Sequence, residues 1–423
     1  MKKSSVFENV EPGHPVEMNL LIKRYMEDKN ENKVNLSIGV YRTEEGKSYV
    51  LPFVKQVEKE IVNDPNLNYD YQPILGTDSF FNIATQLLLG EDSIHIRNKN
   101  AFGLQALSGT GGLRSGAEFL ARIMGYTTFY YSDPSWENHP NIFNAAGFTN
   151  EKTYRYFDRK TFGLDFDGMI EDLQNAPEKA VIILQICGHN PCAVDPTKEQ
   201  WMKIADVIEE KKLFPFFDAA YHGFGTGDLD EDVFPVRYFA DRRIEFFCSQ
   251  SFAKNFGIYN IRCGALTVFT NDPSKISAIL SQMTLRIYFL YETPPACGPR
   301  IVSRILQNAN LKKQWIDTLK IMTARITRMR QKFQDEMIRL KTPGKWDYIT
   351  KHRGMFAFTG ITPEQAEILV DKYHIYVLKC GRINICGITD ENLSYVTKSI
   401  HEVVSMTASK VNDIVEHEKI IQY

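Results

Sequence analysis

Short, continuous apolar runs alternate with helix-like segments through the middle of this chain, and no other feature limits its fold as strongly. The runs include AVIILQI, LFPFFDAA and IEFFCSQS, and stretches with a helical period separate them. An unbroken apolar run is typical of a strand buried on both faces, and helices between such strands favour a parallel sheet. We therefore expect an α/β fold, with a mostly parallel sheet sandwiched by helices and ligands beyond the carboxyl ends of its strands.

A long amphipathic helix is predicted where apolar residues recur every three or four positions from Leu311 to Leu340. Such a helix spans roughly 45 Å, long enough to link two domains. MFAFTG and IYVLKCGRINI after it resemble strands of a smaller α+β domain, which VNLSIGVY near the start is expected to join. We predict an N-terminal arm (residues 1–14), a large domain (48–321) and a small domain built from residues 15–47 and 322–423.

Charge and cysteine usage exclude several classes of partner. The formal net charge is −2, which provides no basic surface for nucleic acid, and no apolar run approaches the roughly 20 residues that cross a bilayer. Seven cysteines are scattered without a CxxC pair or a metal-ligand spacing, so we expect free thiols and no metal. Because the start MKKSSVFENVEPGHP lacks an apolar signal core, we expect a cytoplasmic protein without a membrane or nucleic-acid partner.

The segment SQSFAKNFGIYNIR places Lys254 three residues after Ser251 and eight before Arg262, directly behind an apolar run. A lysine at the carboxyl end of a buried strand can form a Schiff base with an aldehyde cofactor. The neighbouring hydroxyl and guanidinium groups would then hold the phosphate of that cofactor. For a single lysine the simpler interpretation is a solvated surface charge, so the remaining sequence has to supply the other parts of the site.

Two further motifs match the needs of pyridoxal phosphate. The segment SGTGG, Ser108 to Gly112, is predicted as a turn between a strand and a helix, where converging backbone N–H groups favour a phosphate. It is neither GxGxxG nor a P-loop, which argues against dinucleotides and nucleoside triphosphates. Asp218 ends an apolar run and needs a partner such as a protonated pyridine ring, although a helix N-cap is the simpler alternative. Tyr221 could donate to the cofactor's phenolic oxygen.

Three other segments supply groups for the ring and the substrate. Asn190 in GHNPCAVDP could bind the cofactor or a carboxylate, or serve only in a turn. Trp136 in PSWENH could stack on a flat ring or belong to the core, and His139 could support the Asp218 carboxylate. Arg382 lies within the apolar CGRINI, where its planar guanidinium suits bidentate capture of an α-carboxylate.

Together these motifs resemble the class I branch of the fold-type I pyridoxal phosphate enzymes, and within it the aspartate aminotransferase family. The resemblance runs from about Phe7 to Met406 and is most specific in SGTGGLRSGAEFLAR, FFDAAYHGF and SFAKNFGIYNIRCGALTV. It implies a seven-stranded sheet in the large domain and pyridoxal 5′-phosphate as the cofactor. It also implies amino transfer from an L-amino acid to a 2-oxo acid, with aspartate and 2-oxoglutarate giving oxaloacetate and glutamate as the family activity.

The resemblance also implies a role for each candidate residue. The catalytic residues would be Lys254, which forms the Schiff base and then acts as general base, with Tyr221 and Asp218. The phosphate would be held by Ser108, Gly109, Thr110, Ser251 and Arg262, and the ring by Trp136, His139, Asn190, Asp218 and Tyr221. The substrate α-carboxylate would be bound by Arg382, Asn190, Trp136 and the backbone at Gly39. Tyr71 matches a tyrosine that reaches the partner's cofactor, which implies a homodimer with shared active sites.

One departure from the resemblance concerns the substrate side chain. The family binds a distal carboxylate with a partner-donated arginine six residues before a Pro-Pro pair, and this register places Tyr288 there. Arg286 lies two residues earlier, which is about 200° away on a helix but the same face of a strand. Glu292 adds a carboxylate near the pocket mouth that would repel a dicarboxylate. Tyr288 therefore favours a neutral or aromatic substrate, or weak activity on the usual dicarboxylates, unless a local rearrangement lets Arg286 replace the missing arginine.

Milder departures surround the cofactor. Gln185 replaces a histidine, Ala253 replaces a common serine, and Cys192-Ala193 replaces Thr-Gly. None of these changes removes a catalytic group. Two alternatives to an aminotransferase stay open: a pyridoxal phosphate enzyme of another reaction type, a racemase or lyase, and a non-catalytic paralogue.

Overall fold

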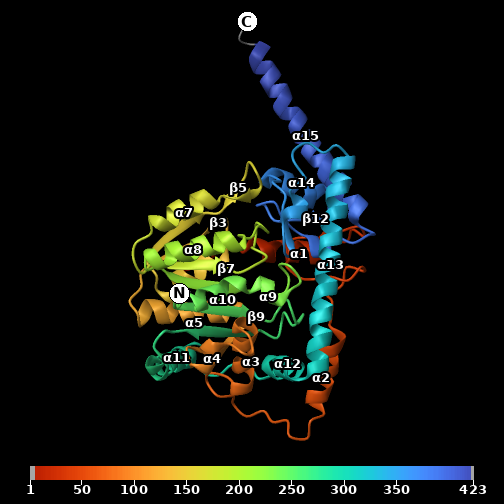
Figure 1. Cartoon of the computed structure of the whole chain (residues 1–423). Coiled ribbons are helices and arrows are strands. Elements are labelled where there is room, and N and C mark those ends of the chain that lie inside the picture. Colours follow the sequence, from red (N-terminus) through yellow and green to blue (C-terminus); the bar gives the residue numbers. More distant parts are fainter. Residues whose placement is uncertain (1–4, 421–423) are drawn as a thin grey trace.

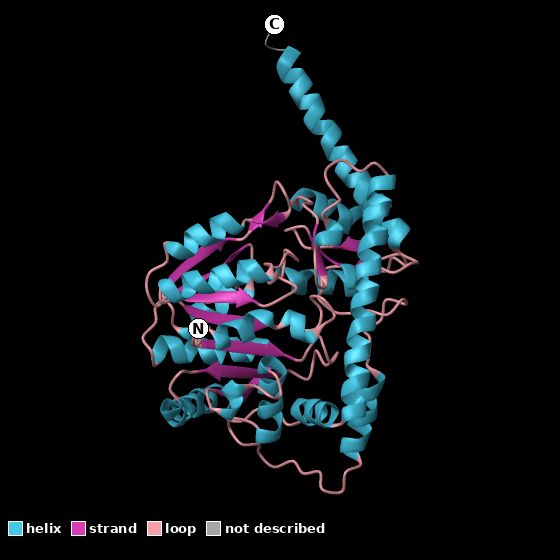
Figure 2. Ribbon diagram, viewed as in Figure 1, coloured by secondary structure: helices cyan, strands magenta, loops and turns pink. Residues whose placement is uncertain are grey.

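The computed structural model describes residues 5–420, and side chains up to residue 406. It contains a large sheet with helices on both faces and a smaller group of helices and short strands beside it (Figures 1 and 2). The sheet order is β2-β10-β9-β8-β7-β3-β4. β10 is antiparallel to both of its neighbours, and the other pairs are parallel. The expected α/β fold with a mostly parallel seven-stranded sheet is confirmed.

The strands at the centre of the sheet are the apolar runs of the sequence. The seven strands are β2 (Ala101–Leu107), β3 (Thr128–Asp133), β4 (Asn150–Arg155), β7 (Val181–Gln185), β8 (Phe214–Ala219), β9 (Phe246–Ser251) and β10 (Cys263–Phe269). Every residue of β7, β9 and β10 is buried, as continuous apolar runs predict. Because β7, β8 and β9 are parallel, their carboxyl ends meet at one edge of the sheet.

Helices cover both faces of this sheet and bury one apolar cluster on each side. One face is covered by α5 (Ser108–Arg122), α6 (Asn138–Ala146) and α11 (Ile276–Tyr291). The other is covered by α3 (Asp78–Leu89), α7 (Phe166–Gln174), α8 (Lys198–Glu210) and α10 (Phe234–Asp241). The remaining elements of this part are α2 (Pro52–Val62), α4 (Ile94–Arg97), α9 (Leu229–Asp232), α12 (Cys297–Gln307) and the hairpin of β5 (Phe157–Asp158) and β6 (Gly163–Leu164). Thr197 and Gln200 form a capping box at the start of α8, as their spacing indicated.

The smaller group combines a segment from the first part of the chain with a longer segment from its last part. It consists of α1 (Glu17–Glu27), β1 (Val34–Asn35), β11 (Phe356–Phe358), α14 (Pro363–Tyr373), β12 (Ile375–Tyr376), β13 (Arg382–Asn384) and α15 (Leu393–Ile420). β1 pairs in parallel with β12, so the early segment VNLSIGVY does join strands from the end of the chain. β11 and β13 form an antiparallel pair. Within residues 5–420, no helix combines the length and apolarity that a bilayer crossing requires.

One helix, α13 (Ala309–Arg339), runs past both groups, as its apolar spacing predicted (Figure 1). Near its start, the fully buried Trp315 stacks on Phe256 with a centroid distance of 4.8 Å. The Trp315 indole also donates to the backbone oxygen of Asn255 at 2.7 Å. Asn255 and Phe256 directly follow Lys254, so α13 supports the segment that carries this lysine.

We expect Trp315→Ala to lower the free energy of unfolding by about 3–5 kcal/mol, because it leaves a cavity and an unpaired carbonyl. Ile321 lies on the same helix but is 69% exposed, so Ile321→Ala is the matched control. That variant should change stability by less than about 0.5 kcal/mol. Urea unfolding followed by circular dichroism measures both. Equal effects would contradict the supporting role of Trp315.

Candidate active site

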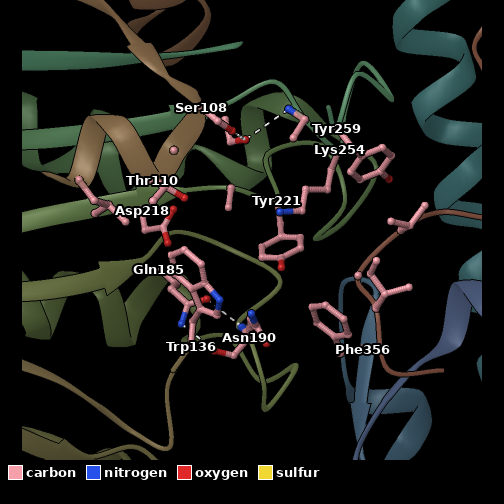
Figure 3. A pocket seen from close by; sticks show the side chains of 18 of the residues that line it. Ser108, Thr110, Trp136, Gln185, Asn190, Asp218, Tyr221, Lys254, Tyr259 and Phe356 are labelled. Atoms are coloured by element: carbon pink, nitrogen blue, oxygen red, sulfur yellow. Dashed lines mark hydrogen bonds between the residues drawn. The ribbon is translucent and has the colours of Figure 1, made fainter. Parts of the chain in front are cut away.

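A cavity of about 300 Å³ lies beyond the carboxyl ends of β7, β8 and β9, where the large sheet faces the smaller group (Figure 3). Its walls bring together most of the candidate residues, although they are far apart in the sequence. The candidates that line it are Gly39, Ser108, Gly109, Thr110, Trp136, Asn190, Asp218, Tyr221, Ser251, Lys254, Arg262 and Arg382. The cavity is therefore the site at which their chemistry can be combined.

Asp218 is a buried carboxylate with one oxygen still to be satisfied. Its Oδ2 accepts a hydrogen bond from His139 Nε2 at 3.0 Å, and the Ser135 hydroxyl donates to His139 Nδ1 at 2.9 Å. This series of two hydrogen bonds orients the Asp218 carboxylate. Its Oδ1 is buried and has no partner among the residues that the structure describes. A buried carboxylate oxygen without a partner favours a cationic N–H group supplied from the cavity.

Lys254 follows β9 and points into the same cavity (Figure 3). Its ammonium lies 4.8 Å from the centre of the Tyr221 ring and makes no ion pair with a described side chain. Burial is the main cause that lowers the pKa of Lys254 to about 8, and the charges of Arg262 and Arg382 act in the same direction. The Asp218 charge opposes them. The amine is thus partly neutral near pH 8 and can act as a nucleophile or a base.

An anion site is built where β2 meets α5. The expected glycine-rich turn is wrong, because α5 begins at Ser108 itself, with a φ of 61° at this residue. Its hydroxyl lies 2.9 Å from that of Ser251, and both line the cavity. A Cβ at Gly109 would come within 3.3 Å of the Ser251 Cβ, so glycine suits this close approach. The free N–H groups of the first helical turn, these hydroxyls and the nearby Arg262 together favour a phosphate.

Arg382 forms the opposite wall. It begins β13 and is 6% exposed, and its Nη1 donates to Asn190 Oδ1 at 2.8 Å. Its Nη2 donates to the Ser37 carbonyl, and its guanidinium lies over the Phe356 ring. No carboxylate side chain in the described part of the chain pairs with it, and its Nε has no partner there. A buried guanidinium held only by neutral groups suits a carboxylate that enters the cavity.

Tyr221 and Trp136 complete the walls around Lys254. Burial raises the pKa of the Tyr221 phenol, although the Arg382 charge and a hydrogen bond from Asn190 oppose this shift. The phenol therefore stays protonated and can donate a hydrogen bond. The Trp136 indole lines the cavity and meets the His139 ring edge-on at 5.3 Å.

The cavity also contains residues to which the sequence assigned no role, although Gln185 was noted there as a departure beside the cofactor. Gln185 and Tyr259 line it, as do the apolar side chains of Met18, Ile38 and Val40. Tyr259 belongs to the Lys254 segment, and its hydroxyl accepts from the Tyr41 backbone at 3.0 Å. No local pattern distinguishes these residues, because tertiary contacts bring them to the cavity.

Two candidate residues lie on the surface, away from the cavity of their own chain. Tyr71 is 83% exposed and Tyr288 is 51% exposed. Arg286 and Tyr288 both lie on α11, so the helical spacing applies and their side chains point about 200° apart. The Arg286 guanidinium lies 5.1 Å from the centre of the Phe289 ring. Arg286 therefore does not occupy the place of Tyr288.

Comparison with known proteins agrees with this geometry. The family model described as aminotransferase class I and II matches residues 31–400. The cytoplasmic aspartate aminotransferase of Caenorhabditis elegans is 45% identical over 407 residues, 96% of this chain and 100% of the relative. The cytoplasmic aspartate aminotransferase structure from Saccharomyces cerevisiae has a TM-score of 0.92 and 38% identity, covering 95% of this chain and 99% of the other. The aromatic-amino-acid aminotransferase of Burkholderia pseudomallei, covalently bound to pyridoxal phosphate, has a TM-score of 0.91 and 35% identity, with coverages of 95% and 100%.

We expect Lys254 in cofactor-free protein to react with acetic anhydride with a midpoint near pH 8, well below exposed lysines, which titrate near about 10.4. Competitive labelling with mass spectrometry of the Lys254 peptide measures this midpoint. Asp218→Asn should move it to lower pH, because the Asp218 charge stabilises the protonated amine. A midpoint at the ordinary value of 10.5 would contradict the role of burial.

Proposed function

The chain belongs to the aminotransferases of class I and II and is a pyridoxal 5′-phosphate-dependent transaminase, and we propose that its cavity accepts aromatic as well as dicarboxylic amino acids. The observation that carries this site is one cavity holding a lysine of lowered pKa, an unpartnered buried carboxylate oxygen and a buried guanidinium. Those three groups match an aldehyde, a pyridinium nitrogen and an α-carboxylate.

The residues present fit the cofactor. The unpartnered Oδ1 of Asp218 would accept from the ring nitrogen, and the hydroxyls of Ser108 and Ser251 would bind the phosphate. Phosphate would also be bound by Gly109, Thr110 and Arg262, and the ring by Trp136, His139, Asn190 and Tyr221. When bound, the cofactor supplies an aldehyde that receives the amino group and a protonated ring that stores the electrons released at the substrate Cα.

The proposed mechanism assigns each charge a task. Arg382 binds the α-carboxylate with Asn190 and orients the substrate, and the Gly39 backbone closes this side of the site. Lys254 first attaches the cofactor, and its Nζ, when neutral, removes the proton from the substrate Cα. The hydrogen-bonded series Ser135–His139–Asp218 holds the Asp218 carboxylate in place. In the second half-reaction, Lys254 returns a proton to the Cα of the product formed from the 2-oxo acid.

The substrate side chain is where this enzyme is proposed to differ from a strict aspartate enzyme. Aspartate is the substrate named for the Caenorhabditis elegans relative, and aromatic amino acids are named for the Burkholderia pseudomallei structure. Here Met18, Ile38 and Val40 give the cavity an apolar wall, and Tyr288 offers a ring and a hydroxyl rather than a second guanidinium. Both features favour an aromatic side chain over a distal carboxylate. Aspartate with 2-oxoglutarate, giving oxaloacetate and glutamate, stays the reference reaction.

A homodimer with shared active sites is part of the proposal. Tyr71 and Tyr288 cannot act in the cavity of their own chain, because they lie on its surface. Leu285 and Phe289 are exposed beside Tyr288 on α11, which gives this face an apolar character suited to a partner. A second copy would bring Tyr71 to the phosphate and Tyr288 to the substrate side chain.

The domain organisation and the cellular location complete the proposal. We infer an N-terminal arm of residues 1–14, a large domain of residues 48–321 and a small domain of residues 15–47 and 322–423, of which residues 1–4 and 421–423 lie outside the described part of the chain. The pairing of β1 with β12 supports the small domain. The name of the Caenorhabditis elegans relative supports a cytoplasmic location. Fluorescent tagging of the chain at either end in its native cell would test that location.

Sedimentation velocity of the purified holoenzyme is expected to give twice the chain mass of 48.6 kDa. Tyr288→Glu and Phe289→Glu together place charges on the exposed face of α11 and should shift the protein toward the single-chain mass. A single-chain mass for the unmodified, active holoenzyme would contradict the shared site.

Single-turnover reaction of the holoenzyme with each common amino acid tests the substrate proposal through loss of the cofactor's visible absorbance. We expect phenylalanine and aspartate to react at rates within about tenfold, because no distal guanidinium distinguishes them by the several kcal/mol of a desolvated ion pair. Tyr288→Arg should raise the rate with aspartate by at least about tenfold and lower that with phenylalanine.

Arg286→Gln is the matched control for that experiment, since it removes the neighbouring cation while leaving Tyr288 in place. It should leave both rates nearly unchanged. A strong preference for aspartate that Arg286→Gln abolishes would overturn the proposal and assign the distal contact to Arg286. Product analysis without a 2-oxo acid excludes a racemase or lyase if the reaction stops after one turnover.

A further inference from the structure

Gln185 makes an unusual pair of hydrogen bonds at the edge of the cavity. It ends β7, lies beside Asp218 in the sheet register and is 7% exposed. Its Nε2 donates to the backbone oxygen of Asn190 at 3.0 Å, and its Oε1 accepts from the Asn190 backbone N–H at 2.8 Å. Figure 3 shows Gln185 and Asn190 on the same side of the cavity as Trp136. Both polar atoms of one side chain are thus bonded to the backbone of one residue.

This pairing fixes the main chain of Asn190. The oxygen and nitrogen of a primary amide lie side by side, so the amide pairs with a backbone N–H and C=O as a neighbouring strand would. The orientation of the amide is also determined, since only its oxygen can accept and only its nitrogen can donate. The same loop is tied a second time, because Asp195 accepts from the backbone N–H groups of Gly188 and His189.

The Asn190 side chain in turn connects two functional groups. Its Oδ1 must face Arg382, because a guanidinium only donates. Its Nδ2 is therefore left to donate, and the hydrogen bond from Asn190 to the Tyr221 phenol has the direction that lowers the phenol's pKa. One short side chain thus holds the carboxylate-binding arginine on one side and the phenol beside Lys254 on the other. A small rotation of the Asn190 backbone would break both contacts.

We propose that Gln185 is a positioning residue, which clamps the backbone of Asn190 so that the Asn190 amide holds both Arg382 and Tyr221 in place. This inference rests on the proposed roles of Arg382 and Asn190 in carboxylate binding. Gln185 itself needs no contact with the substrate, because its two polar atoms are already occupied by Asn190.

The first experiment compares Gln185→Met with Gln250→Met. Both replace a buried glutamine of the same sheet by a side chain of equal length, but Gln250 does not line the cavity. Succinate and 3-phenylpropionate are the probes, since they carry a carboxylate but no amino group, and calorimetry on the holoenzyme measures their dissociation constants. Gln185→Met should weaken both by about tenfold or more, whereas Gln250→Met should change them less than about twofold. Equal effects of the two variants would overturn the proposal.

A second readout is the pH at which the visible absorbance of the bound cofactor changes. Gln185→Met should move this midpoint to higher pH. In the proposed site, Asn190 and Tyr221 donate hydrogen bonds that stabilise the deprotonated phenolic oxygen of the cofactor, and displacing Asn190 would weaken them. A substitution that only destabilised the fold would lower the urea concentration at half-unfolding without shifting the pH midpoint of the absorbance. An unchanged midpoint would therefore contradict a positioning role.

A double-mutant cycle separates positioning from a direct effect. In an Asn190→Ala background, Gln185→Met should cost no further carboxylate affinity, since the side chain it positions is absent. A further loss as large as that in the wild type would overturn the inference. If Gln185→Met does not fold, Gln185→Asn keeps the amide but retracts it by one methylene, and it should lose affinity in the same cycle.

Arg382→Ala keeps this inference distinct from the proposed function. If Arg382→Ala abolishes probe binding and Gln185→Met does not weaken it, the positioning role is wrong and the carboxylate site stands. If Arg382→Ala leaves the affinity unchanged, the proposed carboxylate site itself is wrong.

Discussion

Three ionisable groups face one cavity without forming ion pairs with one another, and the rest of the structure serves to keep them there. Asp218 is held by His139, Arg382 by neutral oxygens, and Lys254 lies over an aromatic ring. Desolvated charges of this kind destabilise a fold unless other groups compensate for them. In the proposed site, an aldehyde cofactor with a phosphate and a protonated ring would compensate for them, which would link cofactor binding to stability.

The sheet and α13 provide the rigidity that such a site needs. The parallel strands β7, β8 and β9 bring Gln185, Asp218 and Ser251 to one edge, where backbone hydrogen bonds set their spacing. Trp315 on α13 holds the segment behind Lys254 through its stack and its bond to Asn255. The remaining wall comes from the smaller group through Arg382, whose bond to Asn190 connects the two parts across the cavity. The guanidinium proposed to bind the substrate is therefore also the one that joins the two parts.

Much of this could be predicted from sequence because it rests on local chemistry. Apolar runs located the strands, and regular apolar spacing located α13. Lys254, Asp218 and Arg382 were recognised because a charged side chain in or next to a buried apolar segment needs a compensating partner. The start of α5 was predicted wrongly as a turn, since glycine-rich segments fit both a turn and a tightly packed first helical turn. Gln185 and Tyr259 could not be assigned roles, because their partners lie in other segments that only the fold brings near. The proposed roles of Tyr71 and Tyr288 depend on a second copy of the chain, so the packing of a single chain does not determine them.

The position of Tyr288 has a genetic consequence. Because it lies outside the cavity of its own chain, in the proposed dimer a change at Tyr288 alters the substrate choice of the neighbouring subunit. In a cell that carries two alleles, mixed dimers would combine the catalytic lysine of one allele with the selectivity of the other. Substrate preference would then be inherited in trans, and an allele that lacks Lys254 could still set the preference of an intact neighbour.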